Sequence, residues 1–157
     1  MIYTELTKRA MKIMVEAHKD QLDHSGLPYM LHPYHVAEQM DDEDSIVVAL
    51  LHDVVEDTDF SIKKLKQYGF TEEQVSALEF LTHDLSIPYE DYIKRVAENP
   101  LATKVKLKDL EHNMDLSRLN KVRPMDLERV EKYQQAYNCL KDKKQDINTA
   151  HKLNVSI

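Results

Sequence analysis

Glycine, cysteine and long apolar runs are all scarce in this sequence, and each scarcity excludes a class of protein. Gly26 and Gly69 are its only glycines, so the chain lacks the glycine-rich loop of Walker and Rossmann nucleotide sites. Cys139 is the only cysteine and has no partner for a disulfide within the chain. No apolar run approaches the ~20 residues of a membrane span, and the N-terminus lacks the basic-then-apolar pattern of a signal peptide. We therefore expect a cytoplasmic protein without a membrane partner.

Positive charge is also in deficit. The formal net charge is −7, which argues against a nucleic-acid partner, because binding a phosphate backbone requires clustered lysines and arginines. An anionic small molecule remains compatible with this charge, since a bound divalent cation and a few local lysines can outweigh it at one site. The sequence carries no indication of the oligomeric state.

The length and the hydrophobic pattern predict one all-α domain. The chain has 157 residues, of which 42% are hydrophobic and 31% are charged, enough for a single core and too few for two domains. Apolar residues recur at helical spacing and no segment alternates like a strand. We predict a single domain of about seven helices over residues 1–146, followed by a weakly periodic tail over 147–157. The helical segments, which number eight when each short one is counted separately, cover about 3–19, 32–40, 45–57, 61–68, 71–84, 88–98, 101–116 and 124–143.

The sequence His52-Asp53-x-x-Glu56-Asp57 is the strongest functional signal. It ends an apolar run over 45–57 that contains no glycine or proline, which predicts a buried helix. Four ionisable groups at the end of a buried helix break the rule that charges stay at the surface, and such breaks cluster at functional sites. On one continuous helix, His52 would lie beneath Glu56 and Asp53 beneath Asp57. The alternative is a solvated helix end with His52 as an ordinary core histidine.

These residue types in this order are suited to a metal site. His52 and Asp53 could both reach one ion, and Glu56 and Asp57 would then hold or deprotonate a water. Histidine and carboxylate ligands suit Mn²⁺, Fe²⁺ or Zn²⁺, and the absence of thiolates disfavours a structural zinc site. The spacing does not select the remaining ligands from the candidates, which are His18, His24, His32, His35, His83, Asp109, His112 and His151.

Several blocks of the chain resemble the HD superfamily of metal-dependent phosphohydrolases. The similarity is greatest to the hydrolase domain of RelA/SpoT-type alarmone enzymes and their small stand-alone relatives, and it extends over nearly the whole chain. The matching blocks are Ala17-His18-x-x-Gln21, Gly26-x-Pro28-Tyr29-x-x-His32-Pro33, Ala49-Leu50-Leu51-His52-Asp53-Val54-Val55-Glu56-Asp57-Thr58, Leu81-Thr82 and Val105-Lys106-Leu107-x-Asp109-x-x-His112-Asn113-Met114.

The resemblance implies a role for each matching residue. It implies one metal ion, usually Mn²⁺, bound by His32, His52, Asp53 and Asp109. It implies that Glu56 and Asp57 position and activate the hydrolytic water. It also implies a small phosphorylated nucleotide as substrate, contacted by Lys106 near the phosphates, by Asn113 near the sugar and by Tyr133 in the last long helix. For Tyr133, amphipathic packing is an equal alternative.

The chain departs from the family pattern in two places. Asp23 stands where the alarmone hydrolases carry an arginine that stacks near the guanine base, and aspartate cannot stack in that way. Asp115-Leu116-Ser117 replaces a common Arg-Thr-Leu. We therefore expect hydrolysis to be retained, with a more acidic rim around the substrate pocket. The chain also shows no segment for the synthetase domain of the longer enzymes, so we do not expect pyrophosphokinase activity.

Three functional hypotheses follow. The first is a phosphohydrolase that resembles (p)ppGpp 3′-pyrophosphohydrolases, with a phosphatase acting on another nucleotide or small phosphorylated metabolite, such as a dinucleotide 2′-phosphate, as the alternative. The second is a nucleotide-sensing module with weak turnover, against which the intact pair Glu56 and Asp57 argues. The third is a structural helical protein whose histidines are incidental.

Overall fold

Helices form the fold, and the all-α prediction is confirmed. The computed structural model describes the backbone of residues 1–154 and the side chains of residues 1–144. Within those residues there is no strand, and one isolated β-bridge joins Leu22 to Pro28. The elements are α1 (Glu5–His18), α2 (Leu31–Glu38), α3 (Glu43–Leu51), α4 (Val54–Asp57), α5 (Ile62–Gln67), α6 (Glu72–Leu81), α7 (Tyr89–Val96), α8 (Pro100–Met114), the 3₁₀ turn η1 (Leu116–Arg118) and α9 (Pro124–Asn154).

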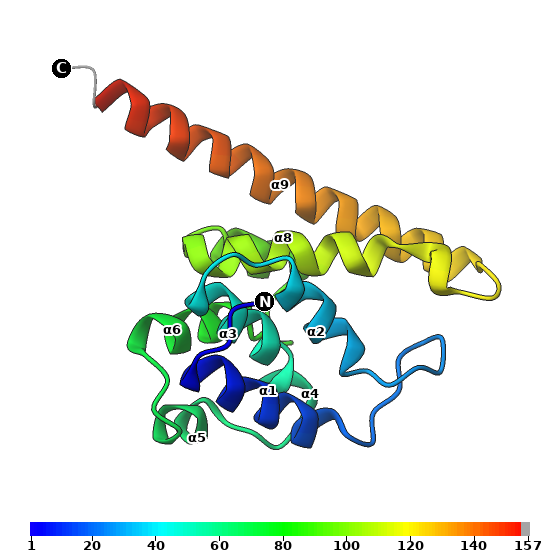
Figure 1. The fold of residues 1–157 in the computed structure, drawn as a ribbon. Coiled ribbons are helices and arrows are strands. Elements are labelled where there is room, and N and C mark those ends of the chain that lie inside the picture. The colour runs from blue at the N-terminus through cyan, green and yellow to red at the C-terminus, as the bar shows by residue number, and fades with distance from the viewer. Residues whose placement is uncertain (155–157) are drawn as a thin grey trace.

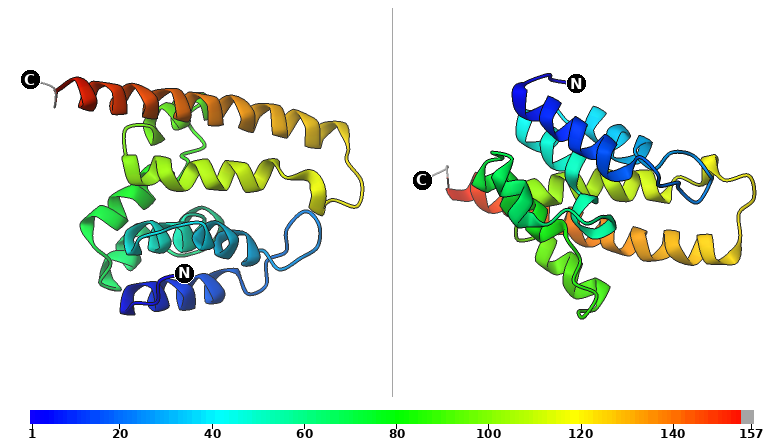
Figure 2. Two further views of the ribbon diagram at one scale, coloured as in Figure 1. Left: turned by 45° about the horizontal axis from the view of Figure 1, so that its top comes forward. Right: turned by 90° about the horizontal axis from the view of Figure 1, so that it is seen from below.

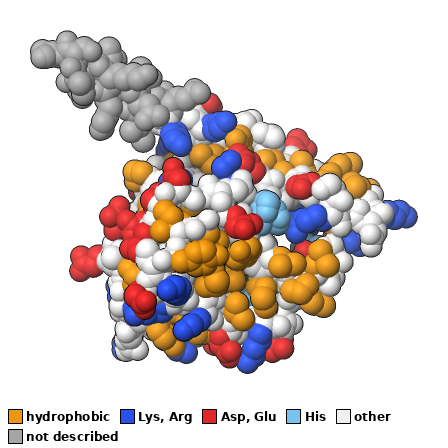
Figure 3. All heavy atoms as spheres, viewed as in Figure 1, with side chains coloured by type: hydrophobic (Ala, Val, Ile, Leu, Met, Phe, Trp, Pro, Cys, Tyr) orange, Lys and Arg blue, Asp and Glu red, His pale blue; other side chains and the backbone are white. Residues whose placement is uncertain are grey.

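Helix α3 is the centre of the core. All of its residues from Ser45 to Leu51 are buried, and it packs against α1, α2, α6 and α8. Burial on all sides explains why its sequence is a continuous apolar run rather than an amphipathic pattern. Helix α9 packs along α8 and α7, and its C-terminal end extends past the other helices (Figures 1 and 2). Acidic, basic and hydrophobic side chains are interspersed on the face in Figure 3.

The acidic turn before α3 caps that helix. The Asp42 carboxylate accepts a hydrogen bond from the backbone N–H of Ser45 at 2.8 Å, and the Lys104 ammonium on α8 pairs with both Asp41 and Asp42. Partial burial would raise the pKa of Asp42, but these hydrogen bonds and the lysine charge outweigh it and lower the pKa to about 2. The turn therefore fastens the start of α3 to α8.

The prediction of one helix over 45–57 is wrong at the point that matters most. Helix α3 ends at Leu51 and α4 begins at Val54, with Asp53 at φ −101° and ψ −4° in the connection. This backbone conformation interrupts the α-helical hydrogen bonding, so His52 and Asp53 lie on a turn rather than on a continuous helix face. From this turn, His52 reaches His32 on α2 and Asp109 on α8, and Asp53 reaches His32.

The last helix is longer than the sequence indicated. Helix α9 continues to Asn154 instead of ending near 143, so residues 147–154 of the predicted tail are helical, and residues 155–157 lie outside the described residues. The boundary between a domain over 1–146 and a tail over 147–157 stays a prediction. No described helix combines the length and the apolar character needed to cross a membrane.

Replacing Leu50 by alanine should destabilise the protein strongly, because Leu50 is completely buried in α3. We expect a loss of about 2–5 kcal/mol in the free energy of unfolding, measured by urea denaturation. The matched control is Leu85→Ala, since Leu85 is 87% exposed and its truncation should cost about 0.5 kcal/mol or less. Equal losses for the two variants would contradict the central position of α3.

Candidate active site

A cavity of about 530 Å³ holds nearly all the site residues that the sequence predicted. Its walls come from the loop after α1, from α4, α7 and α8, from η1 and from the first turns of α9. The predicted residues that line it are His32, Asp53, Glu56, Asp57, Lys106, Asp109, Asn113 and Tyr133. His52 is buried beside them.

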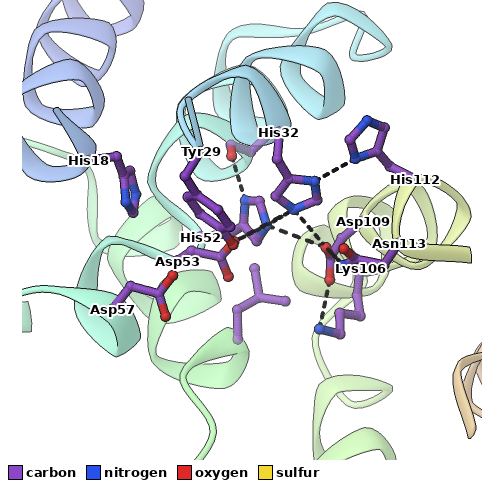
Figure 4. Close-up of polar contacts among 12 residues, drawn as sticks. His18, Tyr29, His32, His52, Asp53, Asp57, Lys106, Asp109, His112 and Asn113 are labelled. Atoms are coloured by element: carbon purple, nitrogen blue, oxygen red, sulfur yellow. Dashed lines mark hydrogen bonds and ion pairs between the residues drawn. The ribbon is translucent and has the colours of Figure 1, made fainter. Parts of the chain in front are cut away.

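Two histidines and a carboxylate meet at the buried end of the site (Figure 4). Within the described residues, His32, His52 and Asp109 form the group whose ligand atoms all lie within 4.8 Å of one another. Asp109 Oδ1 is 3.0 Å from His32 Nε2 and 3.5 Å from His52 Nε2, and the two Nε2 atoms are 3.3 Å apart. These separations suit ligands around one ion with bonds of about 2.1 Å. Tertiary structure thus selects His32 and Asp109 from the candidates that sequence spacing left open.

The other nitrogen of each histidine is already engaged, which leaves Nε2 for a cation. His52 Nδ1 donates to the Ala49 carbonyl at 2.6 Å. His32 Nδ1 lies 2.6 Å from His112 Nδ1. Burial and the positive charges around His112 lower its pKa to about 4, so the His112 ring is neutral near pH 7. A His32 ring that offers Nε2 to a cation carries its hydrogen on Nδ1, and in that tautomer His112 Nδ1 is the acceptor of this hydrogen bond. Such outer hydrogen bonds fix the tautomer and orientation of metal-binding histidines.

The charges at this point of the structure call for a cation. Burial acts to lower the pKa of His52, but the carboxylates of Asp53 and Asp109 outweigh it and raise this pKa well above its ordinary value. Burial acts in the opposite sense on Asp109, whose pKa is nevertheless held well below its ordinary value by Lys106 and the two histidines. A divalent cation would supply the positive charge that a bound proton supplies on His52, because metal and proton compete for the same ligand atoms. The donor set and its electrostatics therefore fit a divalent metal site.

Asp53 lies beside this group. Its Oδ2 atom is 3.0 Å from His52 Nε2 and 3.6 Å from His32 Nε2, and it accepts a 2.5 Å hydrogen bond from the Tyr29 hydroxyl. Burial and the Asp53 charge raise the pKa of Tyr29, so the phenol keeps its proton and acts as the donor. Tyr29 thereby holds one Asp53 oxygen towards the histidines.

Glu56 and Asp57 are adjacent residues of α4, and both line the cavity. Desolvation by the cavity walls, together with the Asp53 charge, raises the pKa of Glu56 to about 7, although its side chain keeps access to solvent in the cavity. Asp57 Oδ2 accepts a 2.9 Å hydrogen bond from Gln21, and Gln21 Oε1 lies 2.7 Å from His18 Nδ1. Glu56 is therefore suited to exchange a proton near neutral pH, and Asp57 is held in place by the loop after α1.

The three predicted substrate residues have different surroundings. Lys106 Nζ is 2.7 Å from Asp109 Oδ2 and Asn113 Nδ2 is 2.6 Å from Asp109 Oδ1, so both orient that carboxylate while also lining the cavity. Tyr133 lines the cavity from α9, with its ring centroid 6.3 Å from that of Tyr89. Contact of any of the three with a substrate stays a prediction.

The two acidic side chains that depart from the family pattern have partners at the rim. Asp23 Oδ2 pairs with Arg118 Nη1 at 3.2 Å, and Asp115 caps η1 through the Ser117 backbone N–H at 2.9 Å. Arg129, which pairs with Asp126, and Lys132 add positive charge to the cavity lining from α9. Distant parts of the chain supply these countercharges, so local sequence comparison around Asp23 could not find them.

Sequence reasoning missed the parts played by Tyr29, His112 and Arg118. Tyr29 belongs to a matching block, but the sequence analysis assigned it no role. Its position three residues before His32 was the available indication that it lies near the cluster. His112 was considered as a ligand, whereas it bonds to the far side of His32. For Arg118 the sequence offers no signal, because its partner Asp23 lies 95 positions away.

The fold and the site define a helical protein of the HD type, with a His/Asp cluster at the base of a polar cavity. No family model matches the chain. The guanosine-3′,5′-bis(diphosphate) 3′-pyrophosphohydrolase of Aquifex aeolicus is 34% identical over 119 residues, covering 68% of this chain and 17% of the relative. The GTP pyrophosphokinase of Myxococcus xanthus is 32% identical over 127 residues, covering 70% and 17%.

A solved structure shows the same fold. A metazoan SpoT orthologue, described as hydrolysing ppGpp, superimposes with a TM-score of 0.69 at 24% identity, covering 91% of this chain and 87% of that chain. The chain is an HD-domain relative of the RelA/SpoT-type enzymes. It spans about a sixth of the length of the curated relatives described above.

Replacing one residue of the His/Asp cluster should abolish metal binding. In Asp109→Asn and in His52→Gln, which leaves the Lys106–Asp109 pair intact, we expect the content of divalent metal after loading to fall from about one equivalent to near zero. The thermal stabilisation that added Mn²⁺ gives the wild type should disappear as well. Elemental analysis and thermal unfolding measure these effects.

The matched control for metal loading is Asp91→Asn, because Asp91 is an exposed carboxylate paired with Lys94 on the surface. It should retain full metal content. Retention of metal by both cluster variants, with circular dichroism showing that they are folded, would refute the assignment.

Proposed function

We propose that this chain is a metal-dependent phosphohydrolase that acts on a phosphorylated nucleotide, with (p)ppGpp 3′-pyrophosphate hydrolysis as the leading activity. The observation that carries the proposal is the buried cluster of His32, His52 and Asp109 in the same cavity as Glu56. Desolvation raises the pKa of Glu56 to about 7. The relatives support the choice of substrate, because one is named for ppGpp hydrolysis and shares 34% identity with this chain.

The residues of the chain would divide the work as follows. His32, His52, Asp53 and Asp109 would hold the ion, and Mn²⁺ is the proposed metal, with Fe²⁺ or Zn²⁺ as alternatives. A divalent cation in that position would lower the pKa of water and polarise a phosphoryl oxygen.

Glu56 would accept the proton of the attacking water, because its pKa lies near the working pH. Asp57, held by Gln21, would orient that water. Arg129 and Lys132 line the wall beside Tyr133 and would attract the phosphates of the substrate. Lys106 would keep Asp109 ionised and directed at the cluster.

The test is release of phosphate and pyrophosphate from a panel of ppGpp, GTP, NADPH, dNTPs and sugar phosphates, each with Mn²⁺ and with EDTA. We expect metal-dependent pyrophosphate release from ppGpp. Release from NADPH or another compound alone would replace the leading substrate with the alternative phosphatase activity. Metal and nucleotide binding without turnover would instead support a sensing module.

Glu56→Gln should lower kcat by about 10²–10⁴-fold while the protein keeps its metal, since Glu56 lies outside the cluster. In the wild type, activity should rise with pH and reach half its maximum at or below about pH 7, where Glu56 loses its proton. A nearby cation would stabilise the carboxylate and can only shift this midpoint downwards.

Steady-state kinetics across pH 5–9 measure both effects of Glu56. Glu98→Gln serves as the control because Glu98 is an exposed carboxylate away from the cavity. Full activity of Glu56→Gln would refute the assigned role of Glu56.

A further inference from the structure

A series of hydrogen bonds connects the interior of the protein to Asp57. His18, the last residue of α1, is completely buried, and its Nδ1 atom lies 2.7 Å from Gln21 Oε1. The nitrogen of the same amide reaches the cavity, where Gln21 Nε2 donates to Asp57 Oδ2 at 2.9 Å. Gln21 and Asp57 line the cavity and His18 does not. Gln21 therefore joins a buried ring to a carboxylate that faces the cavity, and we call these three residues the Asp57 network.

The direction of these hydrogen bonds is determined at the Asp57 end. An ionised carboxylate accepts hydrogen bonds and cannot donate one, so the Gln21 amide must turn its NH₂ group towards Asp57 and its oxygen towards His18. That oxygen can only accept, which makes His18 Nδ1 the donor. The hydrogen of a neutral His18 ring then lies on Nδ1. The buried Nε2 atom has no partner among the described residues, and a hydrogen there would be an unsatisfied buried donor, which is costly.

The loop after α1 fixes the position of Gln21. Its backbone N–H donates to the His18 carbonyl at 3.1 Å, and its carbonyl accepts from the Tyr29 N–H at 2.9 Å. The Tyr29 ring lies beside the His18 ring, with centroids 5.1 Å apart, and the Tyr29 hydroxyl donates to Asp53. The loop therefore presents two fixed donors to the α4 region, Gln21 to Asp57 and Tyr29 to Asp53.

Asp57 depends on its donor for a defined orientation. It is an exposed residue of the four-residue helix α4. Within the part of the chain that the structure describes, Gln21 is the residue that donates to its carboxylate. An exposed carboxylate without a partner can adopt several rotamers, and a shift of about 1 Å in a catalytic site can cost about 10²-fold in rate. A fixed donor at Asp57 therefore matters for the rate of a reaction in this cavity.

We propose that His18 and Gln21 are positioning residues that act through Asp57. His18 fixes the direction of the Gln21 amide, and the amide fixes the carboxylate that would orient the attacking water. The role in hydrolysis rests on the proposed function, whereas the direction of the hydrogen bonds in the Asp57 network does not depend on any activity.

Heteronuclear NMR of the histidine rings and side-chain amides tests the Asp57 network without any turnover. We expect His18 to carry a hydrogen on Nδ1 in the wild type, and the NH₂ signals of Gln21 to shift in Asp57→Ala. A His18 ring with its only hydrogen on Nε2 would overturn the proposal, because Gln21 would then donate to His18 and turn its oxygen towards Asp57. Unchanged Gln21 signals in Asp57→Ala would overturn it as well.

Steady-state kinetics test the role of the network in hydrolysis. Gln21→Met removes the donor at Asp57 with little change in side-chain length, so kcat should fall by about 10- to 100-fold while KM and metal content stay nearly unchanged. His18→Leu should lower kcat in the same way. His18→Asn should restore most of the loss, because the asparagine NH₂ group can donate from the place of the Nδ1 hydrogen.

A double-mutant cycle separates positioning from a structural role. In an Asp57→Ala background, Gln21→Met and His18→Leu should cause no further fall in kcat, since the group through which they act is absent. An equal fall in both backgrounds would indicate a structural role alone and overturn the proposal. Gln134→Met is the matched control, because Gln134 is exposed on α9 and does not line the cavity, and it should keep full kcat.

The two measurements distinguish failure of this proposal from failure of the proposed function. The expected His18 tautomer without hydrolysis of any compound in the panel would reject the proposed function, and the role in hydrolysis with it, and would leave the Asp57 network established. Hydrolysis by the wild type with the opposite tautomer, or with full kcat in Gln21→Met, would reject the positioning role alone.

Discussion

The carboxylate of Asp109 is buried in the interior, and the site is arranged around its need for compensation. An ionised carboxylate away from water is unstable unless positive charge and hydrogen-bond donors surround it. Lys106 and Asn113 from the same helix contact its two oxygens, and His32 and His52 arrive from α2 and from the end of α3. The Asp109 carboxylate of α8 thereby brings together α2, the end of α3 and α8, which are distant in sequence.

The same arrangement places ligand atoms suited to one cation close together. The two histidines point Nε2 towards each other and towards Asp109, while their Nδ1 atoms are bonded to Ala49 and His112. Nitrogen atoms placed 3.3 Å apart beside carboxylates are stable when they share a cation or a proton. The electrostatics that hold α2, α3 and α8 together are thus also those that fit the cluster for a metal ion.

The cavity beside the cluster is lined by charged and aromatic side chains from several segments. Asp23 pairs with Arg118, which links the loop after α1 to η1. Lys132 on α9 lies over the Tyr89 ring of α7, 4.0 Å from its centroid. Specificity in such a pocket depends on residues from η1 and α9, which lie far from the His52-Asp53 turn in sequence.

Local sequence rules predicted much of the fold, and they were wrong where tertiary contacts decide. Helix ends such as the capping box of Thr71 with Gln74 and the turn at Gly69, whose φ is positive, follow local rules because caps depend on residues within one turn. The break at His52 and Asp53 was not predicted, since an apolar run without glycine or proline carries no local signal for it. There the contacts of His52 with α2 and α8, and of Asp53 with α2, outweigh helix propensity.

The sequence by itself determined the helical class, the buried central helix and the set of candidate ligand residues, because these depend on hydrophobic periodicity and on residue types that are costly to bury without a role. Only the tertiary structure decided that His32 and Asp109 lie beside His52. It also decided that Tyr29 and His112 bond to members of this group, and that Arg118 pairs with Asp23, 95 positions away. Those choices depend on distances between helices, and the order of residues along a chain does not encode such distances in any local pattern.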